Sequence, residues 1–180
     1  MNHRTALRAL ALTAALLLTT ALVGVALAKT FTLKEAKNAK VQNGNTNAVT
    51  HATVVENSKS LPVYTLSGDS AKHPKCTKAS GCWQFWPPVK VKSTKGLSAA
   101  TGIKGKLGTW KHNGFLQLTI AGHPLYTFFS DKKNTATGEA LQSFGGTWHV
   151  RTPSGKTVSF ASTSSTGSTG STGSGGGGGW

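Results

Sequence analysis

Apolar and polar positions alternate through the middle of the chain, and no stretch shows the period of an amphipathic helix. Residues 49–56 are rich in β-branched side chains, residues 57–60 supply turn formers, and residues 61–66 resume the alternation. Alternation of this kind is typical of strands with one face buried. The pattern predicts two strands joined as a first β-hairpin.

A second hairpin has the clearest local signal in the sequence. Residues 107–112 and 115–120 flank the dipeptide Asn113-Gly114, which is favoured in two-residue hairpin turns. Every second residue of the later strand is aliphatic from Leu116 to Ile120. Ala121-Gly122 should then turn the chain into a third strand, residues 123–129, which would complete an antiparallel meander.

A last hairpin is expected from residues 147–152 and 156–160 around the turn formers Pro153-Ser154-Gly155. The ordered region would then run from about residue 49 to residue 160. We predict an all-β domain of antiparallel hairpins and meanders, packed as a small sandwich or a barrel-like domain.

Two similar segments indicate a tandem repeat. Residues 122–131 read Gly-His-Pro-Leu-Tyr-Thr-Phe-Phe-Ser-Asp, and residues 61–69 read Leu-Pro-Val-Tyr-Thr-Leu-Ser-Gly-Asp. Both place a proline and an apolar residue before Tyr-Thr, and both place an aspartate five residues after the tyrosine. We therefore expect two related repeats, covering about residues 49–92 and 105–160.

The shared tyrosine and aspartate allow two interpretations. In the structural one, each strand ends shortly after a buried ring, and the carboxylate of Asp69 or Asp131 accepts backbone N–H groups of an Asx turn. In the functional one, repeat symmetry brings Tyr64 and Asp69 together with Tyr126 and Asp131, and with the neighbouring Phe128, to line one polar ligand site. Two carboxylates placed in this way could also serve acid/base chemistry in a hydrolase, which is the least favoured function class.

The chain ends have different compositions. Residues 1–28 combine a basic start, an apolar run and the ending Ala-Leu-Ala, the pattern of a secretory signal peptide whose helix is removed before Lys29. A retained membrane anchor is the weaker alternative, because threonines interrupt the run. Residues 29–48, rich in Lys, Asn and Thr, suggest a linker. Residues 161–180 are Ser/Thr/Gly repeats that predict a disordered tail.

The charge is strongly basic and unevenly distributed. The chain has 20 Lys and Arg, five acids and a formal net charge of +15, and cleavage of the signal peptide would leave about +13. No acid occurs between residues 70 and 130. Such a field attracts polyanions, although it also suits a simple solvated surface. Lysines without an arginine motif do not predict a specific nucleic-acid site. The candidate contacts are Lys90, Lys92, Lys95, Lys104, Lys106 and Lys111.

Cys76 and Cys82 are the only cysteines, and in an exported chain we expect them to form a disulfide. The alternative is a metal or redox site in which His73 joins the two cysteines as a third ligand. The following aromatic cluster, residues 83–86, could stack on sugars or bases but is more often part of a core in a domain of this size.

These residues resemble the bacterial family called secreted repeat of unknown function, described as predicted lipoproteins with a Tyr-x-aromatic-x-x-Asp motif. Residues 126–131 carry the full motif, and residues 122–125 resemble the lead that precedes it. Cys76 and Cys82 followed by Trp-Pro-Pro at 86–88, and the closing Gly-Gly-Thr-Trp at 145–148, are also similar. The resemblance covers about residues 49–160 and implies no assigned activity.

Three departures from the family pattern change what the resemblance implies. Leu66 replaces the motif aromatic in the first copy, which weakens a ligand role there, and the second copy has no cysteine pair. No lipid-accepting cysteine follows the apolar run of the signal peptide. The last departure implies release to the exterior instead of a lipid tether.

We therefore expect an exported, monomeric, non-enzymatic binding or envelope-associated module, located in the periplasm or at the cell surface. It would have no cofactor and no transmembrane span after cleavage, and its partners would be anionic cell-envelope polymers. The alternative is an extracytoplasmic redox or metal-handling protein that uses His73, Cys76 and Cys82.

Overall fold

The computed structural model describes residues 31–161. The expected signal peptide and all but the first residue of the expected tail lie outside this range. The described residues form strands and one 3-10 turn, so the all-β prediction is confirmed. The elements are β1 (Leu33–Asn43), β2 (Val49–Asn57), β3 (Tyr64–Leu66), η1 (Cys82–Gln84), β4 (Lys90–Val91), β5 (Leu107–His112), β6 (Phe115–Ile120), β7 (His123–Pro124), β8 (Thr135–Glu139), β9 (Gln142–Ser143) and β10 (Gly146–Val150).

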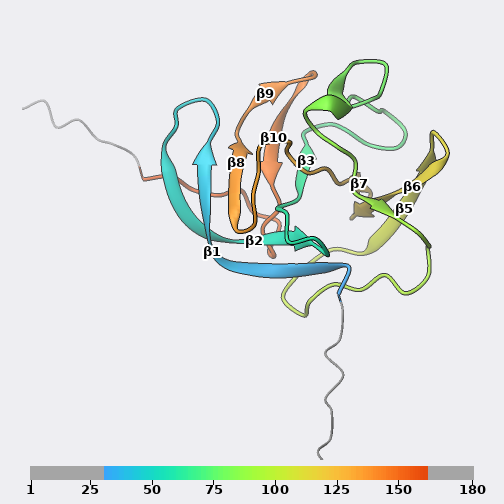
Figure 1. The fold of residues 1–180 in the computed structure, drawn as a ribbon, viewed down its shortest axis with the longest axis horizontal. Coiled ribbons are helices and arrows are strands. Elements are labelled where there is room, and N and C mark those ends of the chain that lie inside the picture. Colours follow the sequence, from blue (N-terminus) through green and yellow to red (C-terminus); the bar gives the residue numbers. More distant parts are fainter. Residues whose placement is uncertain (1–30, 162–180) are drawn as a thin grey trace, which may run out of the picture.

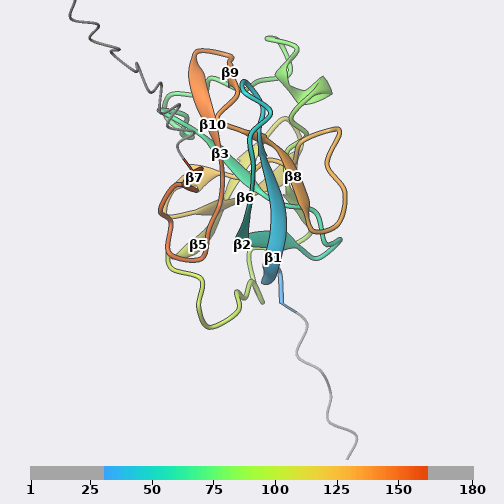
Figure 2. The ribbon, with the colours of Figure 1, turned by 90° about the vertical axis from the view of Figure 1, so that its left-hand side faces the viewer.

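Within residues 31–161 the strands form three small open sheets and no closed barrel. Their orders are β2-β1-β8, β3-β10-β9 and β4-β6-β5, with β7 added to β6. Figure 1 shows β1 and β2 on one side of the molecule, β5, β6 and β7 on the other, and β3 and β10 between them. Figure 2, seen from the side of β1 and β2, has these two strands in front. The ladders are antiparallel except β1 with β8, which is parallel.

The linker expected over residues 29–48 is wrong, because β1 is the longest strand described here. It pairs with β2 along almost its whole length, and its register shifts between Ala36 and Ala39. At this bulge Asn38 adopts a positive φ of 53°, and the extra residue breaks the two-residue alternation by which a strand is recognised. The ordered β domain therefore begins before residue 49.

The second hairpin and the beginning of the meander are confirmed. β5 pairs with β6 in full register, from Leu107 with Ile120 to His112 with Phe115, and β7 follows antiparallel to β6. Both Asn113 and Gly114 have positive φ, as the tight hairpin turn requires. The third strand is shorter than expected, since regular pairing with β6 ends at Pro124.

Two other expected hairpins differ in the structure. β2 takes β1 as its ladder partner, while β3 pairs with β10, and only a few hydrogen bonds such as Val63 N to Val55 O join the chain after β2 back to it. Residues 156–160 form no strand, so the last hairpin is wrong. The partners of β10 are instead β3 and β9, and the sequence pattern did not predict β8 or β9.

The interior contains two cores. One is rich in aromatic residues and includes Tyr64, Trp86, Tyr126 and Trp148, and the other is aliphatic and includes Val63, Leu118, Ile120 and Leu125. In each repeat the apolar residue before the tyrosine lies in the aliphatic core and the tyrosine lies in the aromatic core. This alternation along the strand places the shared segment of both repeats at the junction of the two cores.

The two repeats are intertwined. Three equivalent pairs of residues are each 62 positions apart: Tyr64 and Tyr126, Asp69 and Asp131, Trp86 and Trp148. β10, from the end of the second repeat, pairs with β3 of the first, and β4, from the end of the first, pairs with β6 of the second. The first sheet also combines β1 and β2 with β8 of the second repeat. Every sheet therefore contains strands of both repeats.

Candidate functional site

The tyrosines and aspartates of the two repeats are bonded crosswise. Tyr64 and Tyr126 face each other, with Tyr64 N donating to Tyr126 O at 2.8 Å and Tyr126 N donating to Tyr64 O at 3.1 Å. The Tyr64 hydroxyl donates to Asp131 Oδ2 at 2.7 Å, and the Tyr126 hydroxyl donates to Asp69 Oδ2 at 2.8 Å. Each aspartate therefore binds the tyrosine of the other repeat.

The second oxygen of each carboxylate holds the chain six residues further on. Asp69 Oδ1 accepts the Lys75 backbone N–H at 2.7 Å, and Asp131 Oδ1 accepts both the backbone N–H and the hydroxyl of Thr137 at 2.8 Å. The expected buried rings are present, because both tyrosines are fully buried. The expected Asx turn is wrong, since the accepted N–H groups lie too far along the chain for that motif.

Burial changes the titration of this cluster. Desolvation raises the pKa of Asp131 to about 6, against the opposing hydrogen bonds from Tyr64 and Thr137. Desolvation, followed by the charge of the partnered aspartate, raises the pKa of both Tyr64 and Tyr126 far above the ordinary tyrosine value. The phenols therefore remain hydrogen-bond donors over the whole physiological pH range.

The equivalent tryptophans also meet. Trp86 and Trp148 stack with ring centroids 3.7 Å apart and planes 5° apart. Phe128, the motif aromatic of the second repeat, packs on Trp86 at 4.3 Å and is only partly buried. Gly138 of β8 lies so close that a Cβ there would be 2.6 Å from the Trp86 ring. This packing identifies the Tyr-x-aromatic-x-x-Asp segment as part of the core between the repeats.

Cys76 and Cys82 form the expected disulfide, with their Cα atoms 5.2 Å apart and both residues buried. Because the sulfurs are bonded to each other, they are not thiolates that could join His73 as metal ligands. His73 itself is exposed. No group of three or more His, Cys, Asp or Glu within residues 31–161 could hold a metal ion.

The aromatic cluster after the disulfide is divided between core and surface. Trp86 is buried. Trp83 is half-buried, its ring makes T-shaped contacts with His112 and Phe115, and its ring N–H donates to Cys76 O. Phe85 is exposed. The expectation of a core cluster therefore holds for Trp86, and in part for Trp83, which packs against the same core.

The acidic side chains are directed inward. Apart from the two aspartates, Glu56 accepts the backbone N–H of Asn134, and Glu139 accepts the backbone N–H of Val150 and contacts His149. Four of the five acids thus accept hydrogen bonds inside the fold. Within the described part of the chain, the only ion pair joins His149 and Glu139. The exposed lysines are therefore left without carboxylate partners among these residues.

Several lysines gather around a groove beside β4. Two adjoining hollows of about 230 and 620 Å³ share Thr32, Ser58, Lys59, Lys90 and Val91 in their lining. We call them together the lysine groove. Its exposed cations are Lys59, Lys90, Lys92 and Lys95, and its lining contains no acid.

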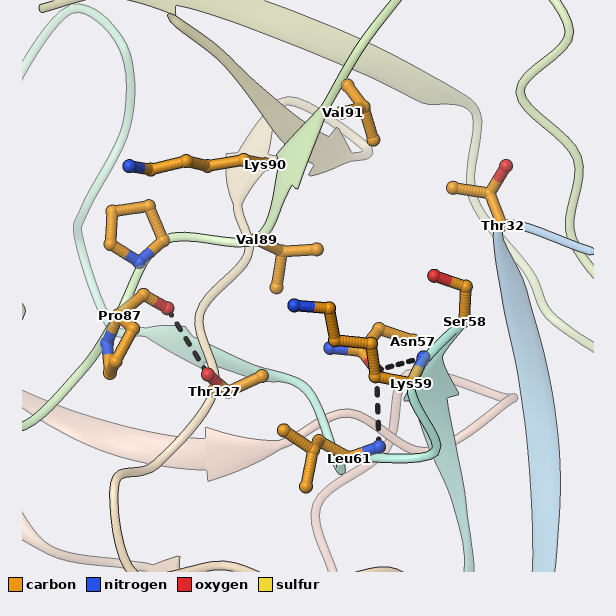
Figure 3. A pocket seen from close by; sticks show the side chains of 11 residues that line it. Thr32, Asn57, Ser58, Lys59, Leu61, Pro87, Val89, Lys90, Val91 and Thr127 are labelled. Carbon is orange, nitrogen blue, oxygen red and sulfur yellow. Dashed lines mark hydrogen bonds between the residues drawn. The ribbon is translucent and has the colours of Figure 1, made fainter.

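The backbone around the lysine groove is well anchored. Figure 3 shows Lys59 on the turn after β2 and Lys90 on β4, on different sides of the hollow. The buried side chain of Asn57 accepts the N–H groups of Lys59 and Leu61 at 2.9 and 3.1 Å, which fixes that turn. The Lys90 ammonium lies 4.4 Å from the centre of the Phe115 ring, a cation–π contact that limits its motion.

The six lysines predicted as polyanion contacts fall into two sets. Lys90, Lys92 and Lys95 line the groove, whereas Lys104, Lys106 and Lys111 are exposed but do not line it. Lys59 also lines the groove but is not among the contacts predicted from the sequence, because its position depends on the contact between the β2–β3 turn and β4. No local sequence signal reports such a contact.

Comparisons with known proteins agree with the second repeat. No curated protein and no solved structure matches the chain. No helix among residues 31–161 is long and apolar enough to cross a membrane. Residues 110–151, which run from β5 to just beyond β10 and contain Tyr126 and Asp131, match the family described as a secreted repeat of unknown function, which confirms the resemblance over this part of the chain.

Proposed function

We propose that the protein is an exported, non-enzymatic binding module that docks on anionic polymers of the cell envelope through the lysine groove. The description of the matched family as secreted supports an extracytoplasmic location. The buried disulfide agrees with it, since disulfides persist in oxidising compartments.

The inward placement of the acids carries this proposal. When four of the five carboxylates are engaged inside the fold, their charge is tied to internal donors, and the lysines dominate the field outside. A solvated surface that served solubility alone would not need this separation. The lysine groove is the proposed place of polymer binding, because it gathers cations from two separate segments. These cations are Lys59, Lys90, Lys92 and Lys95, which line the adjoining hollows.

The shape of the groove favours a polymer over a small ion. Its two hollows adjoin at β4, and its cations come from the turn after β2, from β4 and from the loop that follows β4. Lysine ammonium groups act as point charges on flexible stems. They suit repeated phosphate or carboxylate groups better than a single planar anion that requires a bidentate partner.

The tyrosine–aspartate pairs support a structural role for the motif and favour a binding module over a hydrolase. Both phenols are fully buried, and each carboxylate accepts hydrogen bonds on both of its oxygens. A general acid or base must reach its substrate, whereas these groups bind each other across the repeats.

Two triple variants with the same loss of charge test the proposal. Binding of the full chain to inorganic polyphosphate and to a polycarboxylate would be measured for K90Q/K92Q/K95Q and for the control K104Q/K106Q/K111Q. The loss of three exposed charge contacts should weaken binding about tenfold or more in the groove variant and much less in the control. Affinity should fall steeply with added salt. Equal losses in both variants would show a diffuse field, and no binding to either polymer would overturn the proposal.

A further inference from the structure

A second surface of interest is formed by Phe85 and Phe129. It lies at one end of a pair of antiparallel segments whose other end leads to the lysine groove. Residues 85–89 and 125–129 run antiparallel, joined by Phe129 N to Phe85 O, Thr127 N to Pro87 O and Val89 N to Leu125 O, each at 2.9 Å. The end that contains Val89 leads into β4 and the lysine groove. The opposite end carries Phe85 and Phe129.

Phe85 and Phe129 are exposed apolar side chains that contact each other. They are 47% and 60% exposed, and their rings meet edge to face with centroids 5.6 Å apart. Beside them lies a groove of about 310 Å³, lined by the two rings and by residues that include Trp86, Phe128, Leu141 and Phe144. A contiguous exposed apolar surface of this kind, rimmed by polar residues, is typical of an interaction site.

Exposed lysines occur in the loops that lead to and follow the two phenylalanines. Lys78 is exposed in the disulfide loop that leads to Phe85, and Lys132 and Lys133 are exposed in the loop that follows Phe129. The ammonium of Lys75 lies at the turn beside Phe144, where it donates to Gly145 O at 2.6 Å. Asp131, the one acid in these loops, is turned inward to Tyr64 and Thr137.

We infer that the Phe85–Phe129 surface docks on the interface of an anionic lipid bilayer. Apolar side chains at loop ends, flanked by lysines and without exposed acids, are complementary to a membrane whose acyl boundary accepts the rings and whose headgroups attract the ammonium groups. The only polar side chains in the groove lining are those of Gln142 and Ser143, and this nearly apolar lining is complementary to the acyl boundary of a bilayer. This inference does not rest on the proposed polymer binding, because it uses different residues.

Vesicle flotation tests the inference. The full chain should bind phosphatidylcholine vesicles that contain phosphatidylglycerol and should bind pure phosphatidylcholine vesicles much less. Burial of the two half-exposed rings should strengthen vesicle binding about tenfold or more. F85S/F129S should therefore lower the partition coefficient by about that factor. The control V49S removes an apolar side chain of similar exposure, 48%, at the start of β2, and should bind like the unmodified protein.

Four further measurements keep the outcomes distinct. K78Q/K132Q/K133Q should weaken binding to the anionic vesicles while leaving the aromatic side chains in place, and near-UV circular dichroism should show that each variant is folded. F85S/F129S should still bind polyphosphate, and K90Q/K92Q/K95Q should still bind the vesicles. Equal vesicle binding by F85S/F129S and the unmodified protein, or no binding to anionic vesicles, would overturn the inference.

Discussion

The Tyr64 hydroxyl of the first repeat donates to Asp131 of the second repeat over 2.7 Å. Tyr126 makes the equivalent bond to Asp69 over 2.8 Å. The repeated motif is therefore a reciprocal connection between the two halves of the chain, and its burial explains why the same residue types recur at the same spacing. A ligand site at this position would need the tyrosines to be accessible, and both are fully buried.

Removing either phenol should destabilise the fold without affecting polymer binding. Tyr126→Phe leaves the buried Asp69 short of a donor and should cost about 1–3 kcal/mol of unfolding free energy. Tyr126→Ala also empties a core position and should cost about 3–5 kcal/mol. Urea denaturation measures both. A folded Tyr126→Ala variant that lost binding in a salt-insensitive way would instead make the motif a ligand site.

The exchange of strands predicts that neither repeat folds alone. Residues 31–92 lack the β10 partner of β3, and residues 93–161 lack β4 beside β6. Each fragment would also expose half of the Trp86–Trp148 stack. Circular dichroism and size-exclusion chromatography should find each fragment unfolded, and mixing the two should restore the spectrum of the whole domain. A stable monomeric fragment with native-like spectra would contradict the intertwined arrangement.

Stability should fall as the pH rises from about 4 to 8. Burial raises the pKa of Asp131 from 3.8 to about 6. The stability that Asp131 contributes is therefore fully present when the pH is below its pKa in the unfolded chain, and it is lost as the pH rises through about 6. The hydrogen bond to Glu139 raises the pKa of His149 above 6.5, so its contribution is lost at higher pH, as the pH passes that raised value. Both groups therefore lower the unfolding free energy as the pH rises.

Urea titrations across this pH range would separate the two groups. Asp131→Asn should remove the fall in unfolding free energy between about pH 4 and pH 6, which is on the order of 1 kcal/mol after allowance for solvent screening. His149→Gln should remove the upper part. Unfolding free energy that increased steadily from about pH 4 to pH 8 would contradict the assignment.

Local signals account for what the sequence predicted well. The β5–β6 hairpin depends on Asn113-Gly114, and the disulfide depends on two nearby cysteines in a chain with the pattern of a signal peptide. The all-β class follows from alternation within single strands. These features need no knowledge of distant contacts, because the residues that determine them lie within a few positions of one another.

Features that depend on long-range pairing were missed. The bulge at Asn38 hid the alternation of β1, and the parallel pairing of β8 with β1 joins segments far apart in the chain. The spacing of 62 residues between Trp86 and Trp148 was a usable sign that their positions are equivalent. Even so, a repeat alone does not tell whether Tyr64 binds Asp69 or Asp131. That choice depends on how the two copies pack.

A titration followed by nuclear magnetic resonance tests the polymer-binding proposal most directly. Amide resonances of the full chain would be recorded as inorganic polyphosphate is added, and again after salt is raised to about 1 M to screen exposed charges. We predict that the shifts concentrate at Lys59 and at residues 90–97 around the lysine groove and disappear in high salt. Shifts that centre on Lys104, Lys106 and Lys111, that spread evenly over all exposed lysines, or that persist in high salt would contradict it.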